Sequence, residues 1–267
     1  MLSMIRSIAL AGALIGFGFS TAQAQAAPPL RLDLNIPALE LIVYEGDAPI
    51  VTYRVAVGMP GHDTPDGEYV ISHAEWNPWW RPPTHRPWAR NEKVTPPGPR
   101  NPMGRVKLFF DDMYFIHGTP DAESIGSPAS HGCVRMRNTD VIALSRLLHE
   151  RAAAHVSKAE IDRILSRPSD TRRVNFRQEI PLTVRYHPVV VLNGEVRVYP
   201  DLYNRKAIHN ESVYQALVVA GYDVSGVDAA DVRKLVERGR ATKAPFTLAV
   251  ADAFGAGVAQ TLAASAP

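Results

Sequence analysis

The sequence predicts a mostly β protein with a few helices and a helical C-terminal extension. Short runs of β-branched and aromatic residues, separated by turns, fill residues 27–75 and predict antiparallel strands. Helical periodicity becomes prominent only after residue 138 and dominates from residue 211 to about 239. Because 46% of the 267 residues are hydrophobic and 21% are charged, the chain can bury one sizeable core and a smaller appendage.

Turn residues separate the predicted strands of the N-terminal half. The apolar segments are residues 30–34, 41–44, 50–57, 68–72, 106–110 and 113–116. Gly46, Gly58 and the Thr64-Pro65-Asp66-Gly67 turn interrupt the first four segments, and this spacing favours a meander of antiparallel strands. The last predicted strand ends on His117.

Residues 76–104 have a different composition and predict a long loop. Eight prolines are interleaved there with four tryptophans, which are Trp76, Trp79, Trp80 and Trp88. Such a segment is stiff and aromatic, and we expect it not to form a packed element. Loops of this length inside a compact domain usually have a function.

Helices are predicted after the strands. Asn138 is expected to cap a helix that ends near residue 155, and a second helix covers residues 158–165. Three strand-like runs follow, at residues 180–186, 189–192 and 196–199. Asn193-Gly194 predicts a type I′ hairpin turn between the last two.

We expect domain boundaries near residues 155 and 206. Residues 27–155 would form the main domain, which includes the loop 76–104, and residues 156–206 would form a subdomain of helix and strands. Residues 207–267 would be a helical extension with an Ala-rich tail, and we expect this tail to be disordered from residue 251.

The first 26 residues are typical of a cleaved secretory signal peptide. Arg6 supplies the positive charge, residues 8–19 are apolar, and Ala22-Gln23-Ala24 or Ala24-Gln25-Ala26 offers a cleavage site. The apolar run is too short to span a bilayer, although an N-terminal anchor helix is the alternative. We expect an exported protein without a stable membrane span. The net charge of +2, without basic runs, also argues against nucleic acid as a partner.

Cys133 is the only cysteine, so it has no intramolecular disulfide partner. An inert buried thiol is the alternative, but the surrounding Ser130-His131-Gly132 and Arg135 would make a poor core strand. A nearby imidazole can turn such a thiol into a reactive thiolate, and either His131 or His117 could take the proton. We therefore expect a nucleophile.

Two neighbours of Cys133 extend this interpretation. Gly132 would let the backbone N–H groups of Gly132 and Cys133 face a developing oxyanion, and one such donor contributes about 3 kcal/mol. Arg135 can hold a carboxylate through two hydrogen bonds. The alternative is a metal site of His117, His131 and Cys133, but a fourth ligand is not evident and His-x-Cys is an uncommon chelate spacing.

These motifs resemble a known family. His117-Gly118-Thr119, followed by Ser130-His131-Gly132-Cys133-Val134-Arg135-Met136, closely resembles the signature of the L,D-transpeptidase catalytic domain of the YkuD type. Supporting segments that are similar to longer members of the family are residues 64–69, 77–83, 97–104 and 181–205. The resemblance implies the family's β-rich sandwich for the main domain, over roughly residues 30–205.

The resemblance also implies roles for individual residues. Cys133 would be the nucleophile, and His117 the general base and acid, oriented by a backbone carbonyl near Gly118. His131, with Gly132 and Ser130, would shape the pocket and the oxyanion hole. The residues implied to contact substrate are Arg135, Trp79, Trp80 and Thr119. No metal or organic cofactor takes part.

The implied reaction is peptidoglycan transpeptidation in the periplasm, in cell-wall biogenesis and the maintenance of cell shape. A thioester forms at the diaminopimelate of a tetrapeptide stem, D-alanine leaves, and an amine resolves the acyl-enzyme. The acceptor is a second stem peptide, which gives a 3→3 cross-link, or an outer-membrane protein or lipoprotein. Two alternatives stay open: an L,D-carboxypeptidase or amidase on the same scaffold, and a non-catalytic wall-binding protein.

Overall fold

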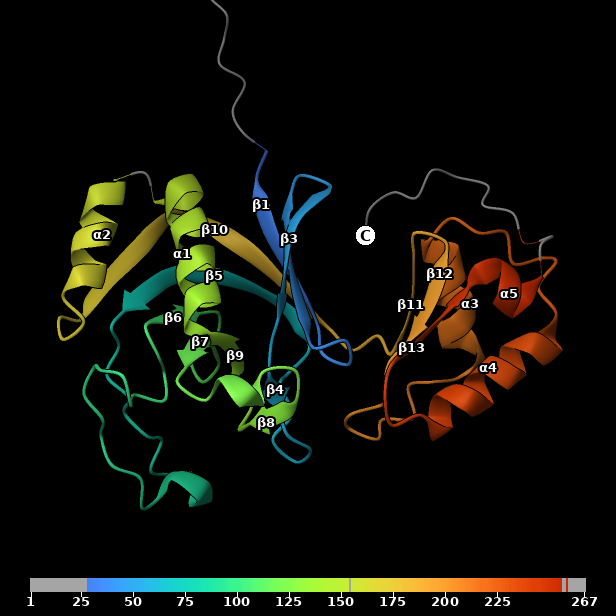
Figure 1. The fold of residues 1–267 in the computed structure, drawn as a ribbon, viewed down its shortest axis with the longest axis horizontal. Helices are drawn as coiled ribbons and strands as arrows, with labels where there is room; N and C mark the ends of the chain where they lie inside the picture. The colour runs from blue at the N-terminus through green and yellow to red at the C-terminus, as the bar shows by residue number, and fades with distance from the viewer. Residues whose placement is uncertain (1–27, 154, 256–257, 259–267) are drawn as a thin grey trace, which may run out of the picture.

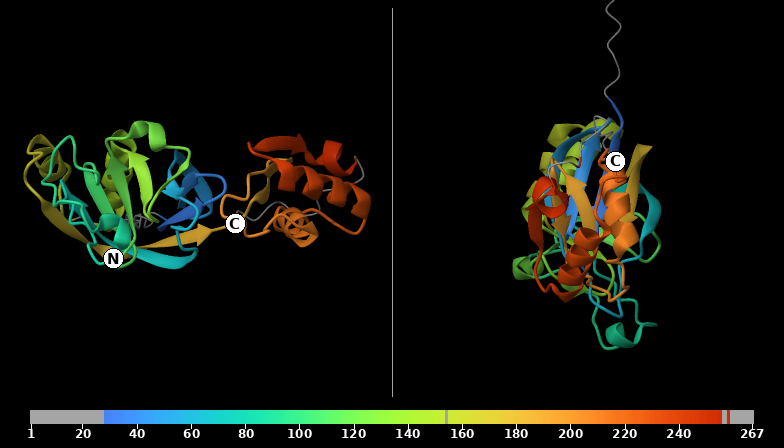
Figure 2. Two further views of the ribbon diagram at one scale, coloured as in Figure 1. Left: turned by 90° about the horizontal axis from the view of Figure 1, so that it is seen from below. Right: turned by 90° about the vertical axis from the view of Figure 1, so that its right-hand side faces the viewer.

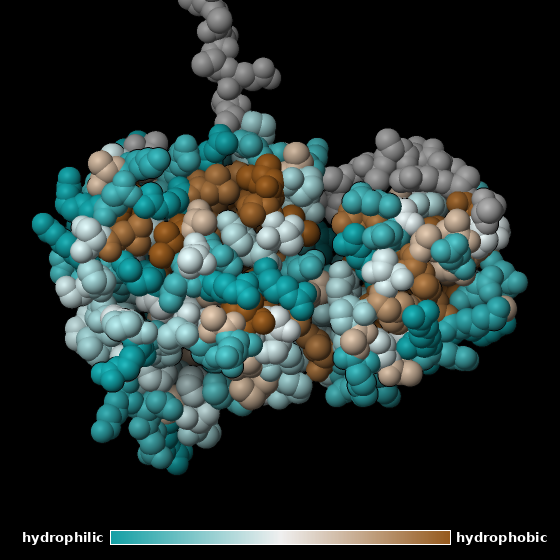
Figure 3. Space-filling model, viewed as in Figure 1, coloured by the Kyte–Doolittle hydropathy of each residue, from teal (hydrophilic) through white to brown (hydrophobic). Residues whose placement is uncertain are grey.

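Two hydrophobic cores divide the protein into two lobes. The structure is a computed structural model that describes residues 28–153, 155–255 and 258. The larger core lies within residues 28–186, here the N-lobe, and the smaller one within residues 187–258, the C-lobe. Figure 1 shows the lobes side by side, and Figure 3 shows each as a rounded body.

A mixed eight-stranded sheet forms the framework of the N-lobe, with the order β3-β2-β1-β10-β5-β6-β7-β9. The strands are β1 (Leu30–Asn35), β2 (Glu40–Glu45), β3 (Ala48–Arg54), β5 (Gly67–Trp76), β6 (Val106–Phe109), β7 (Phe115–Thr119), β9 (Val134–Arg137) and β10 (Arg172–Arg185). The β1–β10 and β7–β9 pairs are parallel, and the other neighbours are antiparallel. The lobe is therefore strand-rich, as expected.

Shorter elements complete the N-lobe. They are β4 (Val57–Gly58) paired with β8 (Pro128–Ser130), the 3-10 helices η1 (Pro87–Ala89) and η2 (Ala122–Ser124), and the α-helices α1 (Asn138–Ala152) and α2 (Lys158–Ser166). Asn138 does not cap α1 as expected, because its side chain bonds instead to Arg105 N and Thr119 O. It thereby ties the start of α1 to the residue that precedes β6 and to the end of β7.

Alternation along the strands separates a core face from a pocket face. Leu108, Ile116 and Val134 are fully buried and belong to the same core as the apolar face of α1. The residues beside them in sequence project from the opposite face of the sheet. This second face carries the candidate site.

The C-lobe has its own three-stranded sheet, β11 (Val189–Leu192), β12 (Glu195–Val198) and β13 (Phe246–Ala249), in that order. Its helices are α3 (Asn210–Val219), α4 (Ala229–Ala241) and α5 (Val250–Phe254). The Asn193-Gly194 hairpin is confirmed, with φ values of 52° and 79°. Among the described residues, no helix is long and apolar enough to cross a membrane.

The structure groups residues 156–206 differently from the expected subdomain. β10 pairs with β1 and β5 in the large sheet, whereas β11 and β12 pack in the core of the C-lobe. Figure 2 shows β10 running toward the C-lobe. The expected boundary near residue 206 is therefore wrong for β11 and β12, which belong to the second core, although Leu202 and Tyr203 after them pack against the first.

Two further expectations need correction. The extension is not purely helical, since β13 adds a strand, and disorder from residue 251 is wrong for α5, where Val250 and Phe254 are buried. Trp76 is fully buried at the end of β5, and its Nε1–H donates to His149 Nε2 at 3.2 Å, so it does not belong to the loop. The expected signal peptide and the end of the tail lie outside the described residues.

Candidate active site

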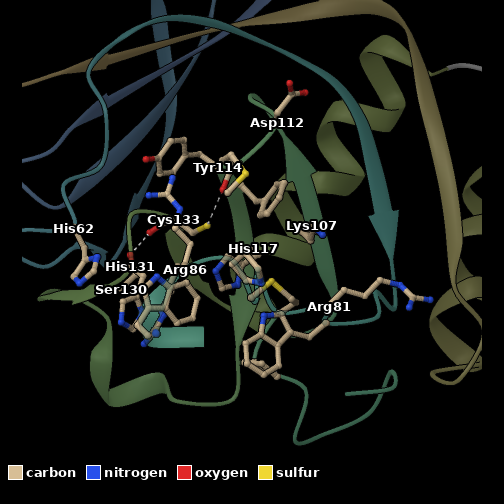
Figure 4. Close-up of a pocket in the computed structure, with 18 of the residues that line it drawn as sticks. His62, Arg81, Arg86, Lys107, Asp112, Tyr114, His117, Ser130, His131 and Cys133 are labelled. Carbon is tan, nitrogen blue, oxygen red and sulfur yellow. Dashed lines mark hydrogen bonds between the residues drawn. The ribbon is translucent and has the colours of Figure 1, made fainter. Parts of the chain in front are cut away.

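A pocket of about 400 Å³ opens on the second face of the sheet. Its floor comes from β6, β7 and the segment that leads into β9, and its walls come from residues 61–63, the loop after β5 and residues 112–114. The pocket contains Cys133, His117, His131, Ser130 and Arg135, which the sequence had singled out (Figure 4). Segments more than 60 residues apart thus meet around one thiol.

Three basic side chains form a row across the pocket floor. His117 on β7 lies opposite Lys107 on β6 and opposite Arg135 on β9 in the strand register. Directly opposed residues project from the same face of a sheet, with their Cβ atoms about 5 Å apart. The row is therefore a consequence of strand pairing, and His117 is its centre.

His117 is held in one tautomer. Its Nδ1 lies 2.6 Å from the Gly118 carbonyl oxygen, and a carbonyl can only accept a hydrogen bond, so Nδ1 carries the proton. The lone pair on Nε2 is then available to take a proton. Burial disfavours the imidazolium and lowers the pKa of His117 from 6.5 to about 4.

The environment of Cys133 also favours its neutral form. Burial raises the pKa of the thiol from 9.0 to about 11, against smaller opposing effects of a Phe115 backbone hydrogen bond, Lys107 and Arg135. With the pKa of His117 lowered, the pair rests at neutral pH as a thiol and a neutral imidazole. Both shifts oppose the standing thiolate that the sequence suggested and favour the neutral thiol beside a neutral imidazole.

Ser130 and Thr64 shape the turn that carries Cys133. Ser130 Oγ accepts from Gly132 N–H at 3.0 Å and donates to the Cys133 carbonyl at 2.5 Å, while Thr64 Oγ1 donates to the Gly132 carbonyl at 2.9 Å. Gly132 has a φ of 110°, and a Cβ there would lie 2.6 Å from a ring carbon of Tyr114. Only glycine fits this turn.

This bonding corrects the expected oxyanion donors. The Gly132 N–H already donates to Ser130, so it does not face the pocket as expected. The Cys133 N–H has no hydrogen-bond partner among the described residues and is the remaining backbone donor of the turn. Ser130 therefore acts on the geometry of the turn, and both the thiol and the unbonded N–H of this turn belong to Cys133.

His131 forms part of the pocket wall. Its ring stacks on Trp88 with centroids 3.9 Å apart and an interplanar angle of 11°, and it meets His62 edge-on at 4.7 Å. Burial, His62 and Arg135 lower its pKa. Since its ring is packed against Trp88 and His62, His131 contributes to the shape of the pocket, and the oriented His117 is the better placed base.

The aromatic loop contributes two tryptophans to the pocket, of which only one was expected. Trp80 lines the pocket, but Trp79 is 40% exposed and does not. Trp88 on η1 does line it, and the sequence analysis had not selected it. Thr119 is buried outside the lining, where its hydroxyl accepts from Asp121 N–H, so the expected substrate contact is wrong. Composition marked this loop, but only folding determined which indole faces inward.

The pocket is rich in positive charge. Arg135 lines it with only a long 3.8 Å ion pair to Asp121, and the other lining cations, which sequence reasoning missed, are Lys107, Arg81 and Arg86. Of the two lining carboxylates, Asp63 pairs with Arg205 and Asp112 is exposed. Such a pocket suits an anionic ligand. Within the described residues, no three His, Cys, Asp or Glu side chains gather to hold a metal ion.

A thiol, an oriented imidazole, a free amide and a cationic pocket are the groups that acyl transfer through a thioester requires. In agreement with this, residues 29–161 match the family model of the YkuD L,D-transpeptidase catalytic domain. The chain therefore carries a catalytic domain of the L,D-transpeptidase family.

Curated relatives bear the same family name. "Probable L,D-transpeptidase YbiS" of Escherichia coli K12 is 34% identical over 116 residues, which is 40% of this chain and 38% of the relative. "Probable L,D-transpeptidase YcfS" of the same organism is 27% identical over 191 residues, 66% of this chain and 59% of the relative. The match thus spans less than two thirds of the length of either relative.

Solved structures of L,D-transpeptidases are also similar. That from Stackebrandtia nassauensis has a TM-score of 0.37 and 19% identity, with 63% of this chain and 60% of the other covered. That from Mycobacterium smegmatis has a TM-score of 0.38 and 14% identity, with 60% and 59% covered.

Proposed function

We propose that the protein is a peptidoglycan L,D-transpeptidase with Cys133 as its nucleophile. The observation that carries this proposal is the Cys133 thiol in a cationic pocket beside His117, whose Nδ1–H is fixed on the Gly118 carbonyl. The fixed ring leaves Nε2 as a base and later as an acid. The substrate class follows from the family, whose members transfer the acyl group of a stem peptide.

The reaction runs in two half-reactions. His117 Nε2 takes the Cys133 proton as sulfur attacks the carbonyl of the donor diaminopimelate, and the Cys133 N–H stabilises the oxyanion. The carbon–nitrogen bond then breaks, His117 returns the proton to the departing D-alanine, and a thioester remains. An amine attacks this thioester, passes its proton through His117 to sulfur, and regenerates the free thiol.

The setting of the reaction follows from the same proposal. The sequence of residues 1–26 indicates export, so we place the protein in the periplasm, in contact with peptidoglycan. Arg135, on the nucleophile side of the row, is proposed to bind a carboxylate of the donor stem.

Mass spectrometry of muropeptides tests the proposal. The reduced mature protein is incubated with disaccharide-tetrapeptide, beside Cys133→Ala as the matched control. Cross-linked dimers that have lost one D-alanine, formed only with the thiol present, are the expected result. Tripeptide as the sole product would assign hydrolysis instead, and identical products from both proteins would exclude Cys133 as the nucleophile.

A further inference from the structure

Lys107 is a cation in the pocket without an anionic partner. Its Nζ lies 4.2 Å from the ring centroid of Phe115 and 4.6 Å from that of Phe109, within cation–π range. Its Nζ makes no hydrogen bond or salt bridge with any described residue, and the carboxylate of Glu75, its neighbour on β5, acts on it only as a nearby charge. The two rings restrict the side chain, so the ammonium is held in place but keeps its donors for a ligand.

The order of groups across the floor suggests which ligand group meets Lys107. Cys133 enters from the β9 side, His117 is on β7, and Lys107 is on β6 beyond it, and Figure 4 shows the three in that order. The attacked carbonyl must lie over sulfur, and the reacting nitrogen must lie near His117, which handles its proton. Whatever is attached to that nitrogen therefore extends toward Lys107.

Simple chemistry identifies the attached group. In the proposed function the leaving group is an α-amino acid, whose carboxylate is on the carbon next to the nitrogen. Adjacent strands are about 4.8 Å apart. A carboxylate two bonds beyond a nitrogen at His117 thus comes within reach of the Lys107 ammonium on the next strand. The charges are complementary, and a charge-assisted hydrogen bond would form.

We propose that Lys107 binds the carboxylate adjacent to the reacting amine in both half-reactions, an inference that rests on the function proposed above. In the first, the carbon–nitrogen bond breaks, the amine takes a proton from His117, and its carboxylate departs from Lys107. In the second, an amine with an adjacent carboxylate occupies the same place, its nitrogen bonds to the thioester carbon, and sulfur leaves and regains the proton.

This assignment restricts the acceptor. An amine with an adjacent carboxylate occurs in free D-amino acids and at the D-centre of diaminopimelate in a second stem. The side-chain amine of a protein lysine has no such carboxylate and would leave the Lys107 ammonium unpaired in a half-buried site, which is costly. The structure thus favours stem-to-stem cross-linking and D-amino acid exchange over protein attachment.

Competition between acceptor amines tests the inference. The full mature protein is given a tetrapeptide donor with D-alanine, D-alaninamide or the amide of Nα-acetyl-lysine, and the products are measured by mass spectrometry. The two alanine amines differ in basicity, but this difference cancels when the rate ratio is compared between protein variants. Isotopically labelled D-alanine distinguishes exchange from the starting donor.

We expect Lys107→Met to reduce the D-alanine to D-alaninamide rate ratio by about ten- to a hundredfold, the range of a charge-assisted hydrogen bond. Lys107→Arg should restore part of the ratio, and Lys107→Gln provides a second test should the Met variant not fold. Lys158→Met makes the same substitution at an exposed site on α2 and should keep the wild-type ratio.

The outcomes separate this inference from the function on which it rests. A folded Lys107→Met protein with the wild-type ratio overturns the role of Lys107, as does wild-type protein that transfers to acetyl-lysine amide as fast as to D-alanine. A wild-type protein that transfers to no amine overturns the proposed transpeptidase function itself, and the acceptor assignment with it.

Discussion

At the scale of single residues, reactivity depends on two groups whose pKa values move in opposite directions. Burial raises the pKa of Cys133 to about 11 and lowers that of His117 to about 4. Both shifts favour the neutral thiol and the neutral imidazole, so in the proposed reaction proton transfer accompanies the attack on the substrate. The same shifts lead to two predictions.

Alkylation of Cys133 by iodoacetamide should keep accelerating as the pH rises through 9, since the thiolate is the reactive form and the pKa of the thiol is about 11. Intact mass spectrometry against time gives the rate, with Cys133→Ala as the blank. A rate that levels off below pH 8 would contradict this prediction and show a thiolate–imidazolium pair in the free enzyme.

Acid should destabilise the fold partly through His117. Its folded pKa of about 4 lies below the unfolded value of 6.5, so the unfolded chain binds the proton more tightly. This contribution is complete above pH 6.5 and is lost as the pH falls toward 4, by about 3 kcal/mol in all. Urea unfolding of wild type and His117→Gln across this window should show a weaker pH dependence for the variant; parallel curves would contradict it.

At the scale of elements, the proline-rich loop after β5 positions aromatic rings against the reacting turn. The η1 helix puts Trp88 flat on His131, whereas Trp79 faces solvent with Arg81 over its ring at 5.6 Å. Two indoles nine residues apart in one loop therefore differ in what they contact, and substitution can separate the pocket wall from the loop's outer surface.

Trp88→Ala should raise KM for the donor by about three- to tenfold, because it removes a stacked pair of the kind that contributes about 0.5–1.5 kcal/mol. Trp79→Ala should leave KM within twofold of wild type and serves as the matched control. Steady-state kinetics with the tetrapeptide donor provides the measurement. Equal changes in KM for the two substitutions would contradict the assignment of Trp88, and not Trp79, to the wall of the pocket.

At the scale of the whole molecule, the C-lobe segment between β12 and α3 is bonded back to residues 58–66 of the N-lobe. Tyr203 Oη donates to the Gly58 carbonyl at 2.9 Å and accepts from Thr64 N–H at 3.1 Å. Arg205 pairs with Asp66 at 2.8 Å and with Asp63 at 3.3 Å. Because Thr64 in turn bonds to Gly132, this segment of the C-lobe supports the turn that carries Cys133.

Tyr203→Phe should lower kcat more than it changes KM, since it releases the support of the Cys133 turn without altering the pocket lining. The unfolding free energy should also fall by about 1–3 kcal/mol, because the partners of the lost hydroxyl remain partly buried. Tyr214→Phe, in α3 against the core of the C-lobe, is the matched control and should keep the wild-type kcat. Equal kcat values for the two variants would refute this coupling.

The sequence by itself determined the candidate chemistry and much of the local structure. Cys133, His117 and Arg135 could be selected as candidates because they stand in motifs that resemble the family's signature, and strands such as β6 and β7 because alternation marks a face. The Asn193-Gly194 turn was predictable for the same local reason, since φ is positive at both residues.

Only the tertiary structure determined which distant residues meet. The Lys107–His117–Arg135 row depends on the register between three strands, and the stacking of Trp88 on His131 depends on how a 30-residue loop closes. Packing also determines that β10 belongs to the core of the N-lobe and β11 to the core of the C-lobe. Propensity and motif act over a few neighbouring residues, whereas strand register and burial come from contacts between segments far apart in the chain.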